Sequence, residues 1–142
     1  MAPIGSGTCV PYDYSGELYP DSVAIFEDVI YVLFPKSEMV EKFDFDGNRI
    51  SSWGGYGSNE GQFIDPSAIA VNNQGAVFIL DKGNHRIQEF DPQGNFVSKW
   101  GTEGMKGGEF YYPQGMYIDD QNCIYVADTK NHHIQKYCPK SQ

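Results

Sequence analysis

Short apolar runs alternate with polar turns along the chain, and the middle third of the sequence shows the order most clearly. An alternating run over residues 68–71 is followed by a turn and by a continuously apolar run over 76–80. A polar corner at 81–85 then leads to runs over 86–90 and 96–100. Runs of this length, rich in Val, Ile and Phe and bounded by Asn, Asp, Gly and Pro, are typical of β-strands. The pattern predicts four antiparallel strands, here called a to d in chain order.

The whole pattern recurs with a fixed offset of 47 residues. Trp53 and Trp100 are separated by 47 positions, and so are Asp81 and Asp128. The same offset of 47 relates several further sets: Gly47 and Gly94; Phe43, Phe90 and Tyr137; Tyr31, Phe78 and Tyr125; Val40, Ile87 and Ile134; Phe63 and Phe110. A repeat of this length is the mark of a tandem architecture in which each copy packs on its neighbour. We therefore expect three copies in residues 1–142 and no further domain within them.

Four antiparallel strands in a period of 40–50 residues predict one blade of a β-propeller. The fold class is thus all-β, with residues 1–142 forming a single propeller domain. We expect blade 1 at about 16–54, blade 2 at about 61–101 and blade 3 at about 108–138. The Asp-x-x-Gly segments at residues 44–47 and 91–94 predict the hairpin turns between strands c and d.

The polar corner carries a family resemblance. Residues 81–87 read Asp-Lys-Gly-Asn-His-Arg-Ile, and the segment 61–66 before them reads Gly-Gln-Phe-x-x-Pro. The third copy repeats both features at 127–134 and 108–113. This arrangement resembles the NHL repeat over nearly the whole chain. The first copy departs from the family pattern, because residues 34–39 replace the Asp-x-x-Asn-His-Arg corner.

NHL-repeat proteins are usually six-bladed propellers, so the resemblance implies that this chain supplies half a ring. We predict a head-to-tail homodimer in which an N-terminal strand at about residues 1–7 completes blade 3 of its partner. The alternatives are a fragment of a longer propeller and a higher assembly of open chains. An isolated arc of three blades would expose two large apolar faces.

Charge and cysteine content narrow the classes of partner. The formal net charge is −9, which repels phosphate backbones and anionic lipid surfaces. We therefore expect no nucleic-acid and no membrane partner, and without a signal peptide or an apolar span we expect a cytoplasmic protein. Cys9, Cys123 and Cys138 form an odd set without CxxC spacing, which favours free thiols. A Cys9–Cys138 approach across the dimer interface is the lesser alternative.

The histidines are the candidates for metal chemistry. His85 and His132 occupy equivalent positions, and His133 follows directly. We favour a structural role in the corner, with no cofactor, and keep zinc or calcium in the central channel, held by His85 and His132, as the weaker alternative. Asp81 and Asp128 each end an apolar strand, where a carboxylate commonly caps the following turn. We predict an Asx-type structural role for both.

Aromatic residues cluster in the d-to-a connections, which we expect to share a rim with the b-to-c corners. No nucleophile elbow, HExxH, P-loop or dinucleotide motif is present. The sequence thus favours a non-catalytic module that binds a protein, peptide or small molecule on the rim or in the central channel. The alternative is a metal-assisted lyase or hydrolase, as in some NHL-type propellers. The candidate ligand-binding residues are Tyr56, Asn84, His85, Arg86, Tyr111, Asn131, His132 and His133.

Overall fold

The computed structural model describes residues 19–140, which form three antiparallel sheets and short connecting elements. The first sheet contains β1 (Ser22–Phe26), β2 (Val29–Phe34), β3 (Met39–Asp44) and β4 (Arg49–Gly54). The second contains β5 (Ala68–Val71), β6 (Val77–Asp81), β7 (Arg86–Phe90) and β8 (Phe96–Trp100). The third contains β11 (Gly115–Ile118), β12 (Ile124–Asp128) and β13 (His133–Tyr137). Single 3-10 turns, η1 (Lys82–Asn84) and η2 (Thr129–Asn131), form the b-to-c corners, and a parallel pair, β9 (Thr102–Glu103) and β10 (Glu109–Phe110), lies in the second d-to-a connection.

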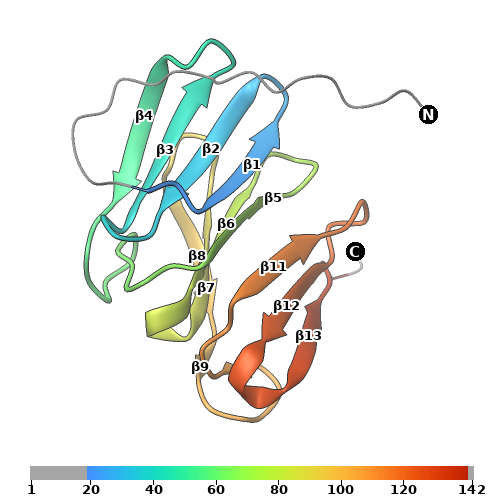
Figure 1. Ribbon diagram of the computed structural model, residues 1–142. Coiled ribbons are helices and arrows are strands. Elements are labelled where there is room, and N and C mark those ends of the chain that lie inside the picture. Colours follow the sequence, from blue (N-terminus) through green and yellow to red (C-terminus); the bar gives the residue numbers. More distant parts are fainter. Residues whose placement is uncertain (1–18, 141–142) are drawn as a thin grey trace, which may run out of the picture.

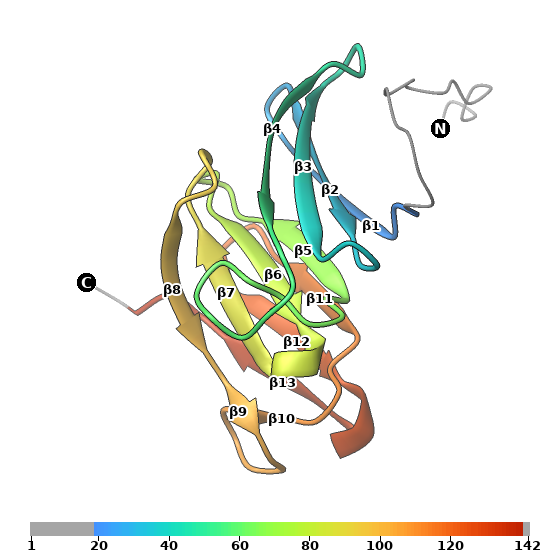
Figure 2. The same cartoon turned by 90° about the vertical axis from the view of Figure 1, so that its left-hand side faces the viewer.

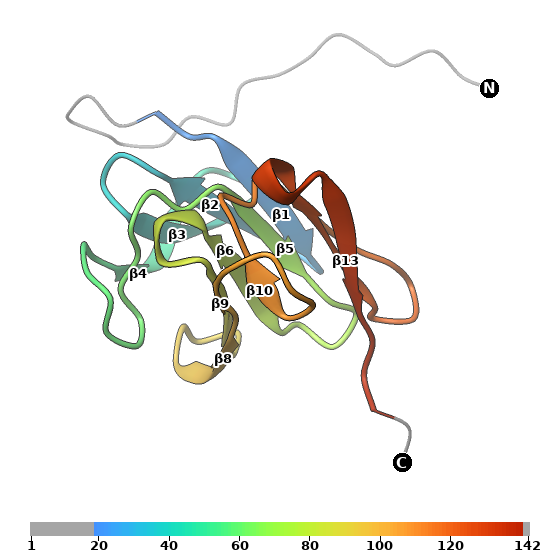
Figure 3. The same cartoon turned by 90° about the horizontal axis from the view of Figure 1, so that it is seen from below.

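The sheets stand side by side as an arc of blades (Figures 1 and 2). Strand β5 contacts both β1 and β11, so the a strands of neighbouring blades meet. In Figure 3, β4, β8 and β13 lie at the periphery, whereas β1 and β5 lie toward the middle. This is the radial arrangement of a propeller. The predicted all-β class and the four-stranded blades are confirmed for the first two copies, and the chain forms part of a propeller.

The core lies between the blades. Between blades 1 and 2, Tyr31, Leu33 and Val40 pack against residues of blade 2 such as Val77 and Ile79. The side chains on one face of a blade cannot be buried by that blade alone, so each core needs the next copy. The equivalent residues form the second core between blades 2 and 3, which consists of Ala68, Phe78, Leu80, Ile87, Phe110, Ile124 and Val126.

Phe63 and Phe110 close the two cores from the d-to-a loops, and both are fully buried. Burial of a phenylalanine side chain stabilises a fold by about 1.5–3 kcal/mol. We call these two phenylalanines the plugs of the cores. A parallel backbone bridge within the loop holds each plug, between Tyr56 and Phe63 in the first loop and between Glu103 and Phe110 in the second. The loops are thus fixed parts of the fold rather than loose connections.

The c-to-d hairpin turns have the predicted form. Gly47 and Gly94 adopt positive φ angles of 90° and 86°, and each donates its N–H to the carbonyl of the aspartate that begins its turn. Asp91 Oδ1 accepts hydrogen bonds from the N–H groups of Gln93 and Asn95, at 3.0 and 2.9 Å. These bonds favour the carboxylate form and lower the pKa of Asp91.

The third blade has three strands in the described part of the chain, with β13 at its outer edge. The predicted N-terminal strand at residues 1–7 lies outside the described residues. No helix in the described chain is long and apolar enough to span a membrane.

Cys123 and Cys138 form a disulfide, so the prediction of free thiols is wrong for these two residues. The physical reason is the register of blade 3. Ile124 pairs with Tyr137 across β12 and β13, which brings the residue before β12 beside the residue after β13. A Cys9–Cys138 pairing is excluded at the same time, because Cys138 is already bonded. Cys9 itself lies outside the described residues.

Candidate functional site

The b-to-c corner of blade 2 is organised around the carboxylate of Asp81, which is completely buried. Asp81 Oδ1 accepts the backbone N–H of Ile64 at 2.9 Å. Asp81 Oδ2 accepts from Arg86 Nε at 2.7 Å, from Asn84 Nδ2 at 2.8 Å and from Gln88 Nε2 at 3.2 Å. A buried charge needs such a set of donors, because an unpaired carboxylate away from water is very costly.

The donors around Asp81 also hold the d-to-a loop in place. The terminal nitrogens of Arg86 donate to the carbonyl oxygens of Ser58, Asn59 and Gln62, each at 3.0 Å. Asn84 Nδ2 donates to the carbonyl oxygen of Gly57 at 3.0 Å. The loop and the corner therefore share one rim, as predicted. Asn84 and Arg86, two of the predicted ligand-binding residues, fix this loop and also line a cleft beside it.

Blade 3 repeats the arrangement around the buried Asp128. Its Oδ1 accepts the N–H of Tyr111 at 2.9 Å, and its Oδ2 accepts from Asn131 Nδ2 at 2.7 Å and Gln135 Nε2 at 3.0 Å. His133 stands where blade 2 has Arg86, with Nε2 at 3.2 Å from Asp128 Oδ2. Asn131 and His133 thus contact the structural carboxylate and fall outside our candidate site.

The aspartates do not form the predicted Asx-type caps, since neither Asp81 nor Asp128 makes a side-chain capping bond to the 3-10 turn that follows. The turn ends instead with a histidine in the left-handed conformation, with φ of 52° at His85 and 58° at His132. Each carboxylate reaches back 17 residues to the preceding loop. The structural role is observed, but the partner is a distant backbone group that sequence spacing does not reveal.

The rim between blades 2 and 3 carries a cluster of aromatic and cationic side chains. The imidazole of His85 stacks on the ring of Tyr111, with 6.0 Å between centroids and 9° between planes. It meets the ring of Tyr112 edge-on at 5.1 Å. The ammonium group of Lys130 lies 4.5 Å from the centroid of the Tyr112 ring, within the range of a cation–π contact. We call His85, Tyr111, Tyr112 and Lys130 the rim cluster.

A cleft of about 540 Å³ adjoins the rim cluster and shares His85 with it. Ser58, Lys99, Thr102 and Glu103 add hydroxyl and charged groups of both signs to its lining. Figure 1 shows both 3-10 corners and β9 at the same, lower end of the molecule, away from the a-to-b turns. The predicted candidate Tyr56 also belongs to a d-to-a loop, and 71% of it is exposed.

The equivalent junction between blades 1 and 2 has different chemistry. Glu38 stands where blade 2 has His85, and Asp65 stands where blade 3 has Tyr112. Burial, and then the nearby Asp65 carboxylate, raise the pKa of Glu38. Lys82 Nζ neutralises Asp65 at 3.1 Å from Oδ2. The rim is therefore acidic at the junction between blades 1 and 2 and aromatic at the junction between blades 2 and 3.

The three histidines do not converge. His85 belongs to the rim cluster, His132 is exposed at the corner of blade 3, and His133 faces Asp128. Across residues 19–140, no three His, Cys, Asp or Glu side chains lie together in a way that could hold a metal ion.

Sequence reasoning missed four residues of these arrangements. Gln88 and Gln135 bind the buried carboxylates, and their recurrence at the repeat offset of 47 on apolar strands was an available signal. Tyr112 and Lys130 have no counterpart in blade 2, where Asp65 and Gly83 occupy their positions. A comparison of the repeats with one another therefore does not reveal Tyr112 and Lys130.

The family model of the NHL repeat matches residues 63–90 and 110–137. The chain contains two NHL repeats. The matched segments run from the buried phenylalanine plug of each loop to the end of strand c, and so contain both buried aspartate corners. They fall in blades 2 and 3, and blade 1 keeps the propeller strands with a different corner. No curated protein sequence matches the chain.

Solved propeller structures resemble this NHL-repeat chain over part of their length. A putative phosphatase from Bacteroides thetaiotaomicron matches with a TM-score of 0.68 and 16% identity over 84% of this chain and 34% of its own. A catalytically inactive variant of virginiamycin B lyase from Staphylococcus aureus, solved with quinupristin, matches with a TM-score of 0.60 and 12% identity, covering 89% and 43%. A protein of unknown function from Bacteroides caccae matches with a TM-score of 0.61 and 15% identity, covering 90% and 45%. The chain spans less than half the length of these structures, and at such identity the likeness shows the fold alone.

Proposed function

We propose that this chain is a non-catalytic binding module that takes a protein or peptide partner on the rim, at the rim cluster and its adjoining cleft. The observation that carries the proposal is the aromatic group of His85, Tyr111 and Tyr112 with Lys130 above it. Tyrosine and cationic side chains of this kind supply large contact area together with polar tips, which is typical of interaction surfaces.

The surroundings of the rim cluster support a partner that is itself a chain rather than a small metabolite. Tyr56 and Met105, with 71% and 78% exposure, add one large exposed side chain to each of the two d-to-a loops. The cleft is open and mixed in charge, because both Lys99 and Glu103 line it. The platform below is rigid, because Asp81 and Asp128 fix both d-to-a loops. A preorganised aromatic surface loses little conformational entropy when a partner binds.

The test uses random peptides displayed on phage and selected against the purified chain, followed by Kd measurements with synthetic copies of the selected peptides. We expect Tyr112→Ala and Lys130→Ala each to weaken binding by about tenfold, the usual size of an interface anchor. The control is Phe45→Ala, since Phe45 is 52% exposed on a c-to-d turn at the far end of blade 1.

Three outcomes would contradict the proposal. One is the failure of selection to enrich any binding peptide. Another is equal loss of binding in the Phe45→Ala control and the rim variants. A third is a stoichiometric metal together with substrate turnover in the purified protein, which would favour the metal-assisted lyase or hydrolase instead.

We further propose that two chains close a six-bladed ring. The outer face of blade 1 exposes Val23 and Ile25, each at 60%, whereas their equivalents in blade 2, Ile69 and Val71, are buried and half-buried. The outer face of blade 3 exposes Ile134 at 73%, whereas its equivalent Ile87 is buried. Within the chain, the equivalents of these two faces pack against each other between neighbouring blades. In the proposed ring, the exposed face of blade 1 would pack in the same way on the exposed face of blade 3 of a second copy.

A further inference from the structure

The rim cluster combines hydrogen-bond donors and a positive charge with aromatic rings. His85 Nδ1 accepts the backbone N–H of Tyr112 at 3.5 Å. When one nitrogen of a neutral imidazole accepts a hydrogen bond, the other carries the proton, so His85 Nε2 is left as a donor. The hydroxyl groups of Tyr111 and Tyr112 and the ammonium group of Lys130 can also donate. The complement of such a set is an acceptor, and a carboxylate is the strongest acceptor that a protein side chain offers.

The charge of Lys130 is not neutralised within residues 19–140. The ion pairs of this part of the chain all involve other residues. Lys130 Nζ lies instead 4.5 Å from the ring centroid of Tyr112 and 5.9 Å from that of Tyr111, and the residue is exposed. The chain has 19 Asp and Glu residues against 10 Lys and Arg residues. A lysine without a carboxylate partner at a binding surface of such a chain favours a negatively charged ligand.

The propeller fold does not require this chemistry, as the junction between blades 1 and 2 shows. There Glu38 and Asp65 replace the histidine and the second tyrosine of the rim cluster, and Gly83 replaces its lysine. The backbone is nearly the same at both junctions, with φ of 52° at both Glu38 and His85, 47° at Asp65 and 53° at Tyr112. The side-chain charges alone therefore distinguish the two junctions. An acidic ligand is attracted to one of them and repelled by the other.

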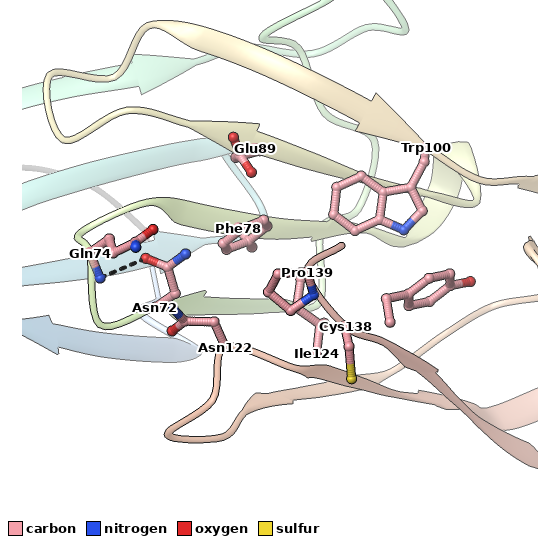
Figure 4. A pocket seen from close by; sticks show the side chains of 10 residues that line it. Asn72, Gln74, Phe78, Glu89, Trp100, Asn122, Ile124, Cys138 and Pro139 are labelled. Atoms are coloured by element: carbon pink, nitrogen blue, oxygen red, sulfur yellow. Dashed lines mark hydrogen bonds between the residues drawn. The ribbon is translucent and has the colours of Figure 1, made fainter. Parts of the chain in front are cut away.

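A pocket of about 330 Å³ toward the a-to-b turns of blades 2 and 3 offers an acidic ligand no cation. Asn72, Gln74 and Asn122 line it from these turns. Glu89 is the one charged residue in the described lining, and Figure 4 shows it across the pocket from Asn122. Burial raises the pKa of Glu89. An acidic segment should therefore bind at the rim cluster and not in this pocket.

We propose that the rim cluster recognises an aspartate or glutamate residue in a segment of the partner protein. This inference rests on the binding role proposed above and adds the chemistry of the partner. The carboxylate of the segment accepts hydrogen bonds from Lys130 Nζ and His85 Nε2. A neighbouring apolar side chain of the segment lies on the rings of Tyr111 and Tyr112.

A single acidic residue fits the surroundings of the rim cluster better than a polyanion does. The adjoining cleft is lined by both Lys99 and Glu103, so it adds no preference for further negative charge. Single-stranded nucleic acid also stacks on aromatic side chains, but its phosphates need a basic groove along several nucleotides. The formal net charge of this chain is −9, which opposes such a ligand.

Selection of random peptides on phage also tests the chemistry of the partner. We expect the enriched peptides to carry Asp or Glu beside an aromatic or aliphatic residue. Synthetic copies in which the acid is replaced by its amide should bind the wild-type chain about fivefold more weakly, as expected for the loss of an exposed charge pair. This comparison changes only the peptide, so it does not depend on how a protein variant folds. The same replacement should have no effect on binding to Lys130→Met, which keeps the aliphatic part of the side chain and loses the charge.

Lys36→Met is the matched control for the loss of charge. Lys36 is an exposed lysine at the b-to-c corner of blade 1, and its Nζ lies 4.9 Å from the ring centroid of Tyr19. Binding to this variant should remain about fivefold sensitive to the replacement of the acid by its amide. Glu89→Gln, which changes the pocket near the a-to-b turns, should behave in the same way.

The outcomes separate this inference from the binding role on which it rests. Enriched peptides without acidic residues, or amide copies that bind equally well, would overturn the inference and leave the rim as a binding surface for other peptides. Full sensitivity to the amide replacement in Lys130→Met would place the acidic contact elsewhere and overturn it too. Failure to enrich any peptide would overturn both proposals. A fluorescein-labelled oligouridylate that binds more tightly than the selected peptides would also overturn the inference, because the recognised anion would then be a phosphate.

Discussion

At the scale of single residues, we expect the buried ion pair of Asp81 and Arg86 to contribute more to the free energy of unfolding than any exposed ion pair. The side chain of Asp81 is 0% exposed and that of Arg86 is 8% exposed, with 2.7 Å between Oδ2 and Nε. Arg86→Ala would leave the carboxylate buried without its charged partner and release three loop carbonyl groups. We expect a loss of about 3–5 kcal/mol in the free energy of unfolding, measured by urea denaturation.

The matched control for this change is Arg49→Ala. Arg49 pairs with Glu41 at 3.2 Å, but 61% of its side chain is exposed. Exposed pairs of this kind contribute about 0–1 kcal/mol, so this variant should unfold almost as wild type does. Equal losses in the two variants would mean that the Asp81 corner does not anchor the loop.

At the scale of elements, the d-to-a loop depends on a close approach between backbones. Gly101 has a φ of 110°, and a Cβ atom there would lie 2.6 Å from the Phe110 ring and 2.9 Å from the carbonyl oxygen of His85. Gly55 has a similar φ of 130° with open space around it. Gly55→Ala should therefore lower the free energy of unfolding by about 1–3 kcal/mol, through backbone strain alone. Gly101→Ala should lower it by clearly more, because steric overlap is added to the strain. Thermal unfolding of both variants checks this order, and a smaller loss for Gly101→Ala would contradict it.

A disulfide links the start of β12 to the end of β13 in blade 3. Cys123 and Cys138 stand 15 residues apart at the two ends of the β12–β13 hairpin. We expect thiol titration of the denatured, unreduced chain to detect one thiol, from Cys9, and three after reduction. Cys138→Ser should lower the free energy of unfolding by about 3 kcal/mol, the value expected for a loop of this length. Three thiols without reduction would show that the link does not form.

Sequence periodicity predicted the strands well and the contacts between distant residues poorly. The strands at 68–71, 86–90 and 96–100 were predicted with the observed limits, because turn residues and apolar runs define them locally. The disulfide was missed because an odd cysteine count does not reveal which strands are paired. The rim cluster was missed in part because Tyr112 and Lys130 are peculiar to one repeat, and repeats reveal only what they share.

At the scale of the whole molecule, the arc of blades leaves two apolar faces that it cannot bury by itself. Val23 and Ile134 are 60% and 73% exposed, although the equivalent Ile69 and Ile87 are 5% and 0% exposed. Apolar surface of this extent commonly marks an interface. The proposed head-to-tail pairing of two chains would cover both faces in one closed ring, whereas any open assembly would leave two faces exposed at its ends.

Light scattering coupled to size-exclusion chromatography tests this assembly. We expect twice the chain mass of 15.9 kDa at all concentrations well above the Kd of the dimer. Ile134→Asp or Val23→Asp should give a monomer, because a carboxylate at the centre of an apolar interface loses its hydration without gaining a partner. Val97→Asp, at a valine that is 53% exposed on the peripheral strand β8, should remain dimeric. A monomeric wild-type chain would contradict the ring, and a dimer that survives both face variants would place its interface elsewhere.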